Sequence, residues 1–458
     1  MYPMLIEALH ERLACGRPIR VALIGAGRFG TTVAAQLGQI PALRLGVVCD
    51  VRAESARGAW EAFSGPAVSD RLVAARSPTD VATAVAEDRP VLTDDLEAAL
   101  AAPVEVVVEA TGRPAIAART VMAALTAGRH VVNVTVEADA LLGPLFQRTA
   151  AARGVVYTLA DGDQPAVTKR LCDWAQALGY EIVAAGRGTR FLPSDAVGVP
   201  EEAFARYGFS PELVQRRRFN PQMYNSFRDG SKAQIEMAAL ANATGLIPDC
   251  RGMHEPAAGV RDLPRVFALR EDGGLLERAG VVELANSVGP DGLELPDGLA
   301  NGVFVIVRTR SPFLAEDLPF YGLPGIAVAS GPGGYAALYR PYHLCGIETP
   351  LSIAEAALLG RPTATPRPTP VAEVITVAKR SLRAGEILDG SGGRTVRGLI
   401  ERAEVARAEG LLPFGLADGA RLRRDVAPGE PIPSDAVDLP ADSPAVRFRR
   451  ELDALLDS

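Results

Sequence analysis

Three glycines, Gly25, Gly27 and Gly30, stand between the apolar run VALI and a segment with helical periodicity. In this G-x-G-x-x-G spacing the first glycine allows a tight turn and the second lets backbone N–H groups approach a pyrophosphate. The third lets helix and strand pack closely. Asp50 ends the next apolar run, about 20 residues further on, where a carboxylate can accept hydrogen bonds from a ribose 2′-hydroxyl. The pattern predicts a dinucleotide-binding site.

The identity of the dinucleotide stays open between NAD and NADP. Asp50 favours NAD because its charge repels a 2′-phosphate, whereas Arg52 lies two residues further on and can pair with that phosphate. A third apolar run, VEVVVEATG, leads into a turn that lies near the nicotinamide ribose or is an ordinary strand-to-helix turn. The residues expected to contact the cofactor are Gly25, Ala26, Gly27, Arg28, Phe29, Gly30, Asp50, Arg52, Ala110, Thr111 and Gly112.

A strongly apolar helix is predicted to begin at a cap, Asp229 or Ser231, and to end at Gly245. It carries Lys232 in its first turn and Glu236 one turn later on the same face. The helix dipole and burial both disfavour the charged form of such a lysine, so we expect its pKa to be lowered into the range of a general acid or base. The alternative is an ion pair of Lys232 with Glu236 that has no catalytic role.

Basic residues in two other segments suit an anionic group. Arg187 and Arg190 flank the glycines of GRGTR, and Arg340 and His343 stand in YRPYH. Guanidinium groups beside flexible backbone can bind a phosphate or a carboxylate. The alternatives are solvated surface charge for the arginines and a structural role for His343.

Two carboxylates, Asp161 and Asp163, lie in the segment ADGDQP. They can face a substrate or bind a divalent cation, but the chemistry of Asp-Gly turns explains them equally well. The need for a metal ion therefore stays open.

The pattern of apolar runs and helical segments around these residues predicts an α/β protein. From Arg20 to about Val155, short apolar runs alternate with helical segments, as in a parallel sheet covered on both faces. The pattern then changes to that of a mixed sheet with helices on one face. The proline-rich segment 361–370 favours a boundary, and two similar phrases beyond it, KRSLRAGEILDG and RRDVAPGEPIPSD, favour a small β-rich domain. We expect a Rossmann domain at 1–155, a catalytic α+β domain at 156–365 and a β-rich domain at 366–458.

The composition excludes several classes of function. With 48 basic and 55 acidic residues in 458, the net charge of −7 gives no electrostatic footprint for nucleic acid or for an anionic membrane. No stretch approaches the roughly 18 apolar residues of a membrane span, and the first segment lacks the pattern of a signal peptide. Five cysteines without a CxxC pair and four dispersed histidines indicate reduced thiols and no structural zinc. We expect a cytoplasmic enzyme with a small, anionic substrate.

Phrases spread over nearly the whole chain carry a family resemblance: IGAGRFG, NVTVEADALLGP, ADGDQP, GRGTRFLP, NSFRDGSKAQIEMAALANATGL, YAALYRPYHL and LDGSGGRTVRG. Together they resemble the homoserine-dehydrogenase-like oxidoreductases with a C-terminal SAF domain, which include the 1-deoxy-D-xylulose 5-phosphate reductoisomerase-like (DRL) enzymes. The resemblance implies a homodimer that uses NADPH to rearrange and reduce 1-deoxy-D-xylulose 5-phosphate to 2-C-methyl-D-erythritol 4-phosphate, in isoprenoid precursor synthesis.

The resemblance also implies roles for the central motif, with Asp229 and Lys232 on either side of the reacting hydroxyl. The expected catalytic residues are Lys232, Asp229 and Glu236, and the expected substrate-binding residues are Arg187, Arg190, Asn225, Ser226, Arg340 and His343. One segment, Val136-Glu137-Ala138, lacks the lysine that homoserine dehydrogenases carry there. Three functions stay open: the DRL-like reaction, a homoserine-dehydrogenase-like reaction on another small hydroxy or keto compound, and a non-catalytic dinucleotide sensor.

Overall fold

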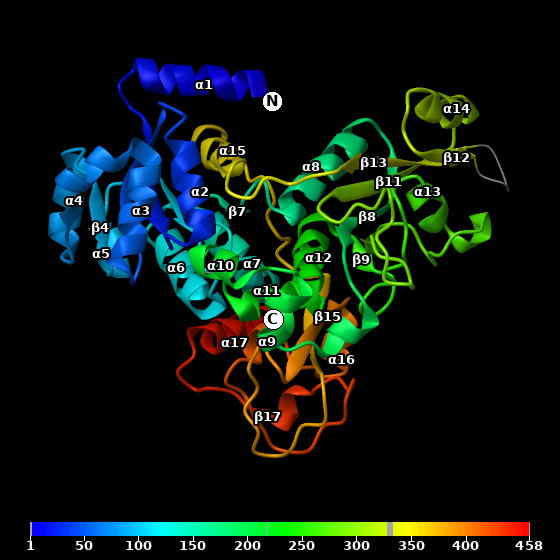
Figure 1. Cartoon of the computed structure of the whole chain (residues 1–458). Helices are drawn as coiled ribbons and strands as arrows, with labels where there is room; N and C mark the ends of the chain where they lie inside the picture. The colour runs from blue at the N-terminus through cyan, green and yellow to red at the C-terminus, as the bar shows by residue number, and fades with distance from the viewer. Residues whose placement is uncertain (1, 218, 328–332, 458) are drawn as a thin grey trace. The chain divides into compact units, whose positions relative to one another are not determined.

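The computed structural model describes residues 2–217, 219–327 and 333–457, and its internal contacts divide the chain into two units (Figure 1). The first unit comprises Met1–Ala166, Leu344–Pro368 and Phe448–Ser458. The second comprises Val167–His343 and Thr369–Arg447. Among the described residues, no helix is both long enough and apolar enough to span a bilayer.

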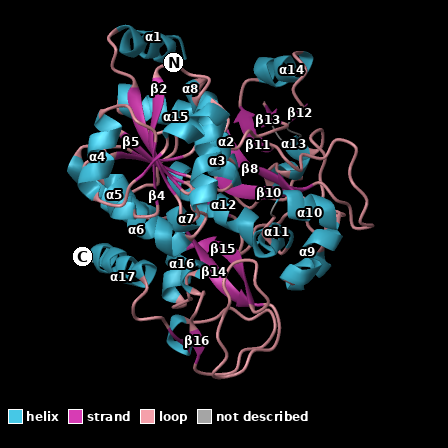
Figure 2. Cartoon of the chain, turned by 60° about the vertical axis from the view of Figure 1, so that its left-hand side comes forward, coloured by secondary structure: helices cyan, strands magenta, loops and turns pink. Residues whose placement is uncertain are grey.

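The first unit contains a seven-stranded sheet in the order β3-β4-β2-β1-β5-β6-β7, in which every neighbouring pair is parallel. Its strands are β1 (Ile19–Ile24), β2 (Leu43–Cys49), β3 (Val73–Ala74), β4 (Val91–Thr93), β5 (Val106–Glu109), β6 (His130–Asn133) and β7 (Tyr157–Leu159). The helices between and beside them are α1 (Tyr2–Ala14), α2 (Arg28–Leu37), α3 (Ala53–Ser64), α4 (Pro78–Ala86), α5 (Leu96–Leu100), α6 (Pro114–Thr126), α7 (Val136–Arg153) and α15 (Thr349–Ala354). Figure 2 shows these strands as a twisted fan with helices around it. The predicted parallel α/β domain is confirmed.

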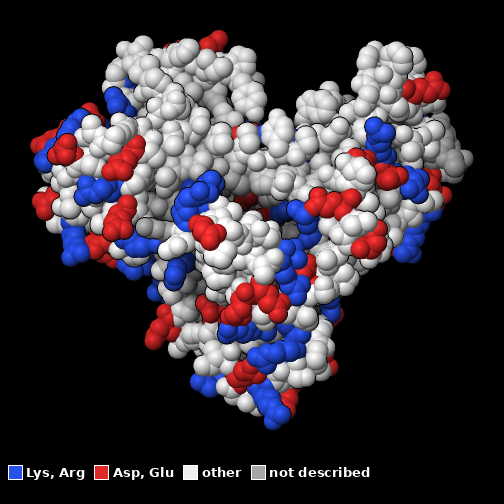
Figure 3. All heavy atoms as spheres, in the orientation of Figure 1, with Lys and Arg blue, Asp and Glu red and all other residues white. Residues whose placement is uncertain are grey.

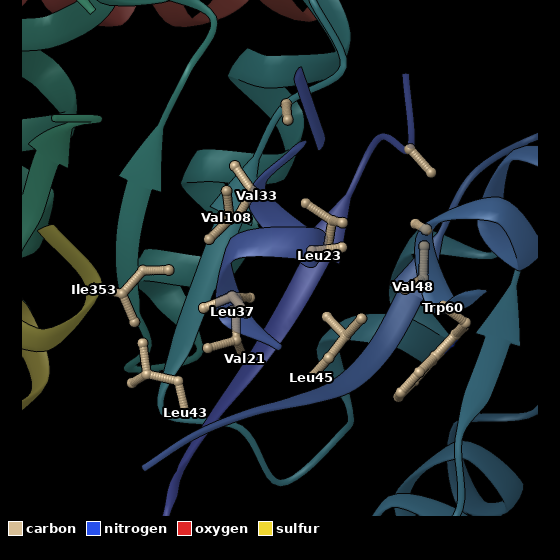
Figure 4. Close-up of a cluster of buried hydrophobic side chains, with 14 of the residues drawn as sticks. Val21, Leu23, Val33, Leu37, Leu43, Leu45, Val48, Trp60, Val108 and Ile353 are labelled. Atoms are coloured by element: carbon tan, nitrogen blue, oxygen red, sulfur yellow. The ribbon is translucent and has the colours of Figure 1, made fainter. Parts of the chain in front are cut away.

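The core of the first unit fixes α2 against the centre of this sheet. Val21 and Leu23 of β1 pack in one cluster with Val33 and Leu37 of α2 (Figure 4). Strands β2 to β4 are added to the sheet on one side of β1, and β5 to β7 are added on the other side. The order of strand addition therefore reverses at β1. In such sheets ligands bind at the carboxyl ends of the strands beside this switch point. The packing therefore places the start of α2 at the expected ligand site.

The division into units differs from the expected ranges 1–155, 156–365 and 366–458. Strand β7 lies beyond residue 155 but extends the first sheet through its pairing with β6. Ile353 of α15 belongs to the same apolar cluster as β1. The proline-rich segment lies beside β7, where the N–H groups of Thr363 and Ala364 both donate to Thr158 Oγ1 at 3.0 Å. Residues 344–368 thus belong to the first unit because they share its apolar core and form hydrogen bonds with β7.

The second unit contains a six-stranded mixed sheet in the order β12-β13-β11-β8-β10-β9. Strands β8, β10 and β9 are parallel to one another, whereas β11 and β13 run antiparallel to their neighbours. The strands are β8 (Glu181–Thr189), β9 (Ile247–Pro248), β10 (Val281–Asn286), β11 (Val303–Thr309), β12 (Gly325–Ala327) and β13 (Gly334–Arg340). The helices are α8 (Gln164–Ala177), α9 (Pro200–Arg206), α10 (Pro211–Arg217), α11 (Pro221–Arg228), α12 (Ser231–Thr244), α13 (Leu263–Val266) and α14 (Pro312–Phe320).

The C-terminal part is rich in short strands, as expected, and it belongs to the second unit. It contains β14 (Ala372–Ala378), β15 (Val396–Arg402), α16 (Ala403–Ala408), β16 (Arg421–Leu422) and β17 (Val437–Asp438). The helix α17 (Pro444–Asp457) follows, and its residues from Phe448 onward belong to the first unit. Side chains of α12 occupy the outer edge of β15: Ser231 Oγ accepts from Gly398 N at 3.0 Å, and Gln234 Oε1 accepts from Ile400 N at 2.8 Å. These bonds satisfy edge amides that would otherwise be unpaired, and so they tie the hairpin to the helix.

Charge on the surface is mixed in sign. On the face shown in Figure 3, Lys and Arg lie among Asp and Glu without a large patch of either sign. This mixed distribution on the visible face agrees with the small net charge of −7.

Candidate active site

The glycine loop after β1 has the geometry that its spacing predicts. Gly25 has a φ of +94°, and a Cβ on it would lie 2.6 Å from the carbonyl carbon of Ala110. A Cβ on Gly30 would overlap the carbonyl oxygen of Gly25, whereas a Cβ on Gly27 would meet nothing within 4 Å. Gly25 and Gly30 are therefore required by the fold, and Gly27 leaves open space at the start of α2.

The first turn of α2 can accept an anion. Gly27 is its N-cap and provides no side-chain hydrogen bond to the first amides of the helix. Those N–H groups and the helix dipole favour a phosphate at this position. Arg28 is exposed, whereas Phe29 packs against the core of the unit. The loop thus fits the pyrophosphate of a dinucleotide, with Phe29 supporting the loop from the core side.

Asp50 is placed beside this loop by two hydrogen bonds. Its Oδ2 accepts from Ala26 N and its Oδ1 accepts from Arg52 N, both at 2.8 Å. The Arg52 side chain is 62% exposed and its Nε lies 3.9 Å from Asp50 Oδ1. Both predicted ribose-binding residues therefore lie next to the glycine loop.

The turn after β5 lies at the same edge of the sheet. Ala110 N donates to Ile24 O at 2.7 Å, and Thr111 N donates to the Glu109 carboxylate at 2.9 Å. Gly112 N donates to Thr135 Oγ1 at 3.0 Å. Glu109 is fully buried, and burial raises its pKa. The three expected residues Ala110, Thr111 and Gly112 are thus held beside the loop, and Glu109, which the sequence reasoning missed, fixes their turn.

We expect opposite outcomes from alanine at two of the loop glycines. Gly27→Ala should leave the thermal stability unchanged but weaken dinucleotide binding, because the new methyl group occupies open space that the pyrophosphate needs. Gly30→Ala should lower the free energy of unfolding by at least about 2 kcal/mol, because the methyl group meets backbone. Thermal melts and titration with NADPH and NADH measure the two effects. Unaltered cofactor affinity in Gly27→Ala would contradict the placement of the site.

The predicted helix α12 in the second unit carries a buried ion pair. Glu236 has a side-chain exposure of 2% and pairs with Arg187 Nη1 from β8. Arg187 Nε also donates to Gly188 O at 3.0 Å, which fixes the guanidinium. Lys232 lies half-buried in the first turn, one turn before Glu236. The structure thus brings together Arg187, Lys232 and Glu236, three of the residues predicted for the site.

Asp229 lies two residues before the first residue of α12 and has partners within the protein. Its side chain is fully buried, and Oδ2 lies 2.6 Å from Nζ of Lys379, which follows β14. Oδ1 accepts from Ser231 N at 2.9 Å. Burial raises the pKa of Asp229, although Lys379 acts in the opposite direction. In this structure Asp229 therefore supports the start of α12, and its contact with a reacting hydroxyl stays a prediction.

Three family models match consecutive parts of the chain. Residues 25–158 match the homoserine dehydrogenase NAD-binding domain, residues 162–349 the catalytic domain of oxidoreductase DRL, and residues 373–438 the SAF domain. The chain has the domain composition of a DRL oxidoreductase. It is thus an NAD-binding oxidoreductase, and α12 with its ion pair lies in the DRL catalytic domain.

Matches to solved structures are distant. A probable dehydrogenase from Thermotoga maritima has 12% identity and a TM-score of 0.37, over 75% of this chain and 90% of that chain. An oxidoreductase from Agrobacterium radiobacter, in complex with NAD+, L-tartaric acid and magnesium, has 13% identity and a TM-score of 0.27, over 38% of this chain and 44% of that chain. The myo-inositol dehydrogenase from Lactobacillus casei has 16% identity and a TM-score of 0.27, over 41% and 50%. The chain thus covers half or less of the latter two structures. No curated protein matches the sequence significantly.

The other residues expected to bind substrate in the DRL catalytic domain have local partners. Asn225 is buried, and its Nδ2 donates to Gly392 O of the SAF domain at 2.8 Å. Ser226 Oγ donates to Met223 O at 2.7 Å, within its own helix. Both residues thus support the segment around α11 in this structure, and their contact with substrate stays a prediction.

Arg190, Arg340 and His343 lie in loops or at strand ends. Arg190 is exposed and pairs with Glu294. The guanidinium of Arg340 lies 4.5 Å from the ring centroid of Tyr342, and His343 Nδ1 donates to Asn301 O at 2.7 Å. These contacts favour the alternative interpretation of surface charge and a structural histidine.

The carboxylates of the ADGDQP segment stabilise a turn. Asp161 Oδ1 accepts from Gly162 N at 3.0 Å, and Asp163 Oδ1 accepts from Gln164 N at 2.9 Å. These contacts agree with turn chemistry. In the described ranges of the chain, no group of three or more His, Cys, Asp or Glu side chains has the arrangement of a metal site.

Glu255 is a candidate site residue that the sequence reasoning missed. It is half-buried in the DRL catalytic domain, has a φ of +48°, and its Oε1 accepts from Thr189 Oγ1 at 2.6 Å. Burial raises its pKa to about 7. A positive φ at a non-glycine residue is strained and is often retained at functional sites. A carboxyl with this pKa can exchange a proton near neutral pH. Its local sequence, HEPAAG, gives no signal of this.

We expect Glu255→Gln to change how stability depends on pH. Because folding raises the pKa of Glu255 from 4.5 to about 7, its contribution to stability is present below pH 4.5 and is lost as the pH rises through about 7. The variant lacks this titration, so its free energy of unfolding should fall less than that of the wild type over this interval. Urea denaturation at a series of pH values measures the difference, with the exposed Glu294→Gln as control. Parallel curves for Glu255→Gln and the wild type would show that Glu255 titrates normally.

Proposed function

We propose that this protein is an NADPH-dependent oxidoreductase that rearranges and reduces 1-deoxy-D-xylulose 5-phosphate to 2-C-methyl-D-erythritol 4-phosphate, for isoprenoid precursor synthesis. The observation that carries the proposal is the match of residues 162–349 to the DRL catalytic domain, over the part of the chain that holds Arg187, Lys232 and Glu255. We further propose that it acts as a cytoplasmic homodimer, as the family resemblance implies.

The choice of NADPH rests on the two residues beside the glycine loop. Both carboxylate oxygens of Asp50 accept hydrogen bonds from backbone amides, so the carboxylate is held in place. The exposed Arg52 guanidinium is available to pair with a 2′-phosphate. NAD remains the competing cofactor, because Asp50 can also accept hydrogen bonds from a ribose hydroxyl. When bound, the dinucleotide supplies the hydride.

The side chains of the DRL catalytic domain supply the other functions. Lys232, at the positive end of α12, holds or moves the proton at the carbonyl or hydroxyl oxygen of the substrate. Glu255 provides a second group that can exchange a proton near neutral pH. Arg187, fixed by its ion pair with Glu236, contacts the substrate from β8.

A substrate screen that follows nicotinamide absorbance tests the proposal. The full-length protein is incubated with NADPH or NADH and with 1-deoxy-D-xylulose 5-phosphate, homoserine or aspartate semialdehyde, with and without Mg²⁺ and after treatment with a chelator. We expect NADPH oxidation with the sugar phosphate. Turnover of homoserine or the semialdehyde would instead favour a homoserine-dehydrogenase-like activity, and cofactor binding without any turnover would favour a sensor. The chelator reveals any need for a divalent cation.

A further inference from the structure

One face of β15 in the SAF domain lies along a loop of the DRL catalytic domain. The side chains of residues 397, 399 and 401 share this face, because successive side chains of a strand point to opposite faces. Glu401 Oε2 pairs with Arg251 Nε at 2.7 Å, and a Cβ on Gly252 would lie 3.4 Å from Leu399. The same register directs Arg397 toward the end of the loop that carries Glu255. Consistent with this placement, the charge of Arg397 acts to lower the pKa of Glu255.

Arg397 is half-buried and has no carboxylate partner among the described residues. Its Nη1 lies 3.5 Å from Asp229 O, at the outer limit of a hydrogen bond. Across the described ranges it forms no ion pair within 4.0 Å. Burial lowers the pKa of Arg397, and nearby Asp229 and Glu255 only oppose this effect. A desolvated guanidinium without a partner is costly for the folded protein, and it suits a ligand that brings its own negative charge.

The carboxylates around Arg397 have other partners. Asp229 pairs with Lys379. Glu255 accepts a hydrogen bond from Thr189, and its pKa of about 7 leaves it partly protonated at neutral pH. The positive charge of Arg397 is therefore not balanced locally, although the whole chain has a net charge of −7.

The position of Arg397 is fixed relative to Lys232. Ser231 precedes Lys232, and Gly398 follows Arg397. The Oγ of Ser231 accepts from the N–H of Gly398 at 3.0 Å. The bond between Gln234 Oε1 and Ile400 N is a second such connection, about one turn further along α12 and two residues further along β15. The helix that carries the proposed proton-transfer lysine and the strand that carries Arg397 are thus held in register by side-chain hydrogen bonds.

We propose that Arg397 of the SAF domain binds the anionic group of the substrate, a phosphate monoester, so that the SAF domain completes the substrate site. The phosphate class rests on the proposed function, whereas the assignment of an anion to Arg397 rests on its burial, its missing partner and its register with Lys232. The guanidinium would donate two parallel hydrogen bonds to phosphate oxygens. The C-terminal domain is then part of the catalytic machinery.

Anion binding by full-length variants tests this assignment. Binding of inorganic phosphate and of 1-deoxy-D-xylulose 5-phosphate is measured by calorimetry in the presence of NADP+, which cannot donate a hydride, for the wild type, Arg397→Gln and Arg397→Lys. We expect Arg397→Gln to weaken both affinities at least about tenfold, and Arg397→Lys to weaken them less. The control is Arg394→Gln on the same hairpin, where Arg394 is exposed and pairs with Glu201. It should bind both ligands like the wild type.

Two further measurements separate this role from a structural one. Removal of an unpaired, half-buried cation should leave the melting temperature of Arg397→Gln unchanged or raise it, whereas a structural arginine would lower it. The wild type should also prefer the phosphorylated sugar over 1-deoxy-D-xylulose, and Arg397→Gln should lose this preference. Wild-type affinities in Arg397→Gln would overturn the assignment, as would a wild type that binds neither anion.

The experiments distinguish failure of the proposed reaction from failure of the proposed anion site. If the wild type binds phosphate through Arg397 but does not oxidise NADPH with the sugar phosphate, the proposed reaction is wrong and the anion site stands. If the wild type turns over the sugar phosphate and Arg397→Gln has the same KM, the reaction stands and the anion site is wrong.

Discussion

Lys232→Met should abolish turnover and leave dinucleotide binding unchanged. Lys232 lies half-buried in the first turn of α12, which begins after Gly230 at a φ of +83° without a side-chain cap. This position is at the positive end of the helix dipole, which disfavours a positive charge. Loss of a general acid or base lowers kcat by about 10²–10⁴-fold. Methionine keeps most of the side-chain volume, and it is a good helix former.

Steady-state kinetics and fluorescence titration with NADPH measure the two quantities separately. The chain contains three lysines, so Lys169→Met provides a matched control. Lys169 lies in α8, where it pairs with Asp173 four residues further on. That variant should keep the wild-type kcat. A Lys232→Met enzyme with the wild-type kcat would remove Lys232 from the mechanism, and one that loses NADPH affinity would assign Lys232 to cofactor binding instead.

The glycine loop shows what the sequence predicts well. The conformations of Gly25, Gly27 and Gly30 depend on neighbours within a few residues, apart from the contact with the adjacent strand end. A spacing of glycines between an apolar strand and a helix therefore determines the local geometry almost completely. The parallel sheet follows for the same reason, because each run of buried β-branched residues specifies its own strand.

The candidate site depends on contacts that no local pattern contains. Asp229 and Lys379 are 150 positions apart in the numbering, and neither neighbourhood suggests the other. Burial raises the pKa of Glu255, whereas the hydrogen bond from Thr189, on a different element, lowers it. Asn225 and Ser226 belong to a motif that resembles a family, but the bonds that they form became visible only in the folded chain. Long-range packing determines these properties, so sequence patterns could not predict them.

The buried pair of Asp229 and Lys379 provides the largest expected effect on stability. The two side chains are 0% and 1% exposed, and Lys379 Nζ also donates to Gly198 O at 3.0 Å and Gly393 O at 2.6 Å. Lys379→Met leaves the Asp229 carboxylate buried without its cation, which should lower the free energy of unfolding by about 3–5 kcal/mol. Lys169→Met removes only an i,i+4 pair on a helix and should change it by about 0–1 kcal/mol.

The double variant Lys379→Met, Asp229→Asn distinguishes a buried ion pair from two independent contacts. Asparagine keeps an acceptor for Ser231 N but carries no charge, so the double variant should recover a large part of the stability that Lys379→Met loses. Urea denaturation of the four proteins gives the coupling energy, and simple addition of the two single losses would contradict the pair. The loss in Lys379→Met should also shrink as the pH falls, because Asp229 becomes neutral by binding a proton. Since Asp229 accepts a hydrogen bond from the first residue of α12, Ser231, Lys379→Met should also reduce kcat by disturbing the first turn that carries Lys232.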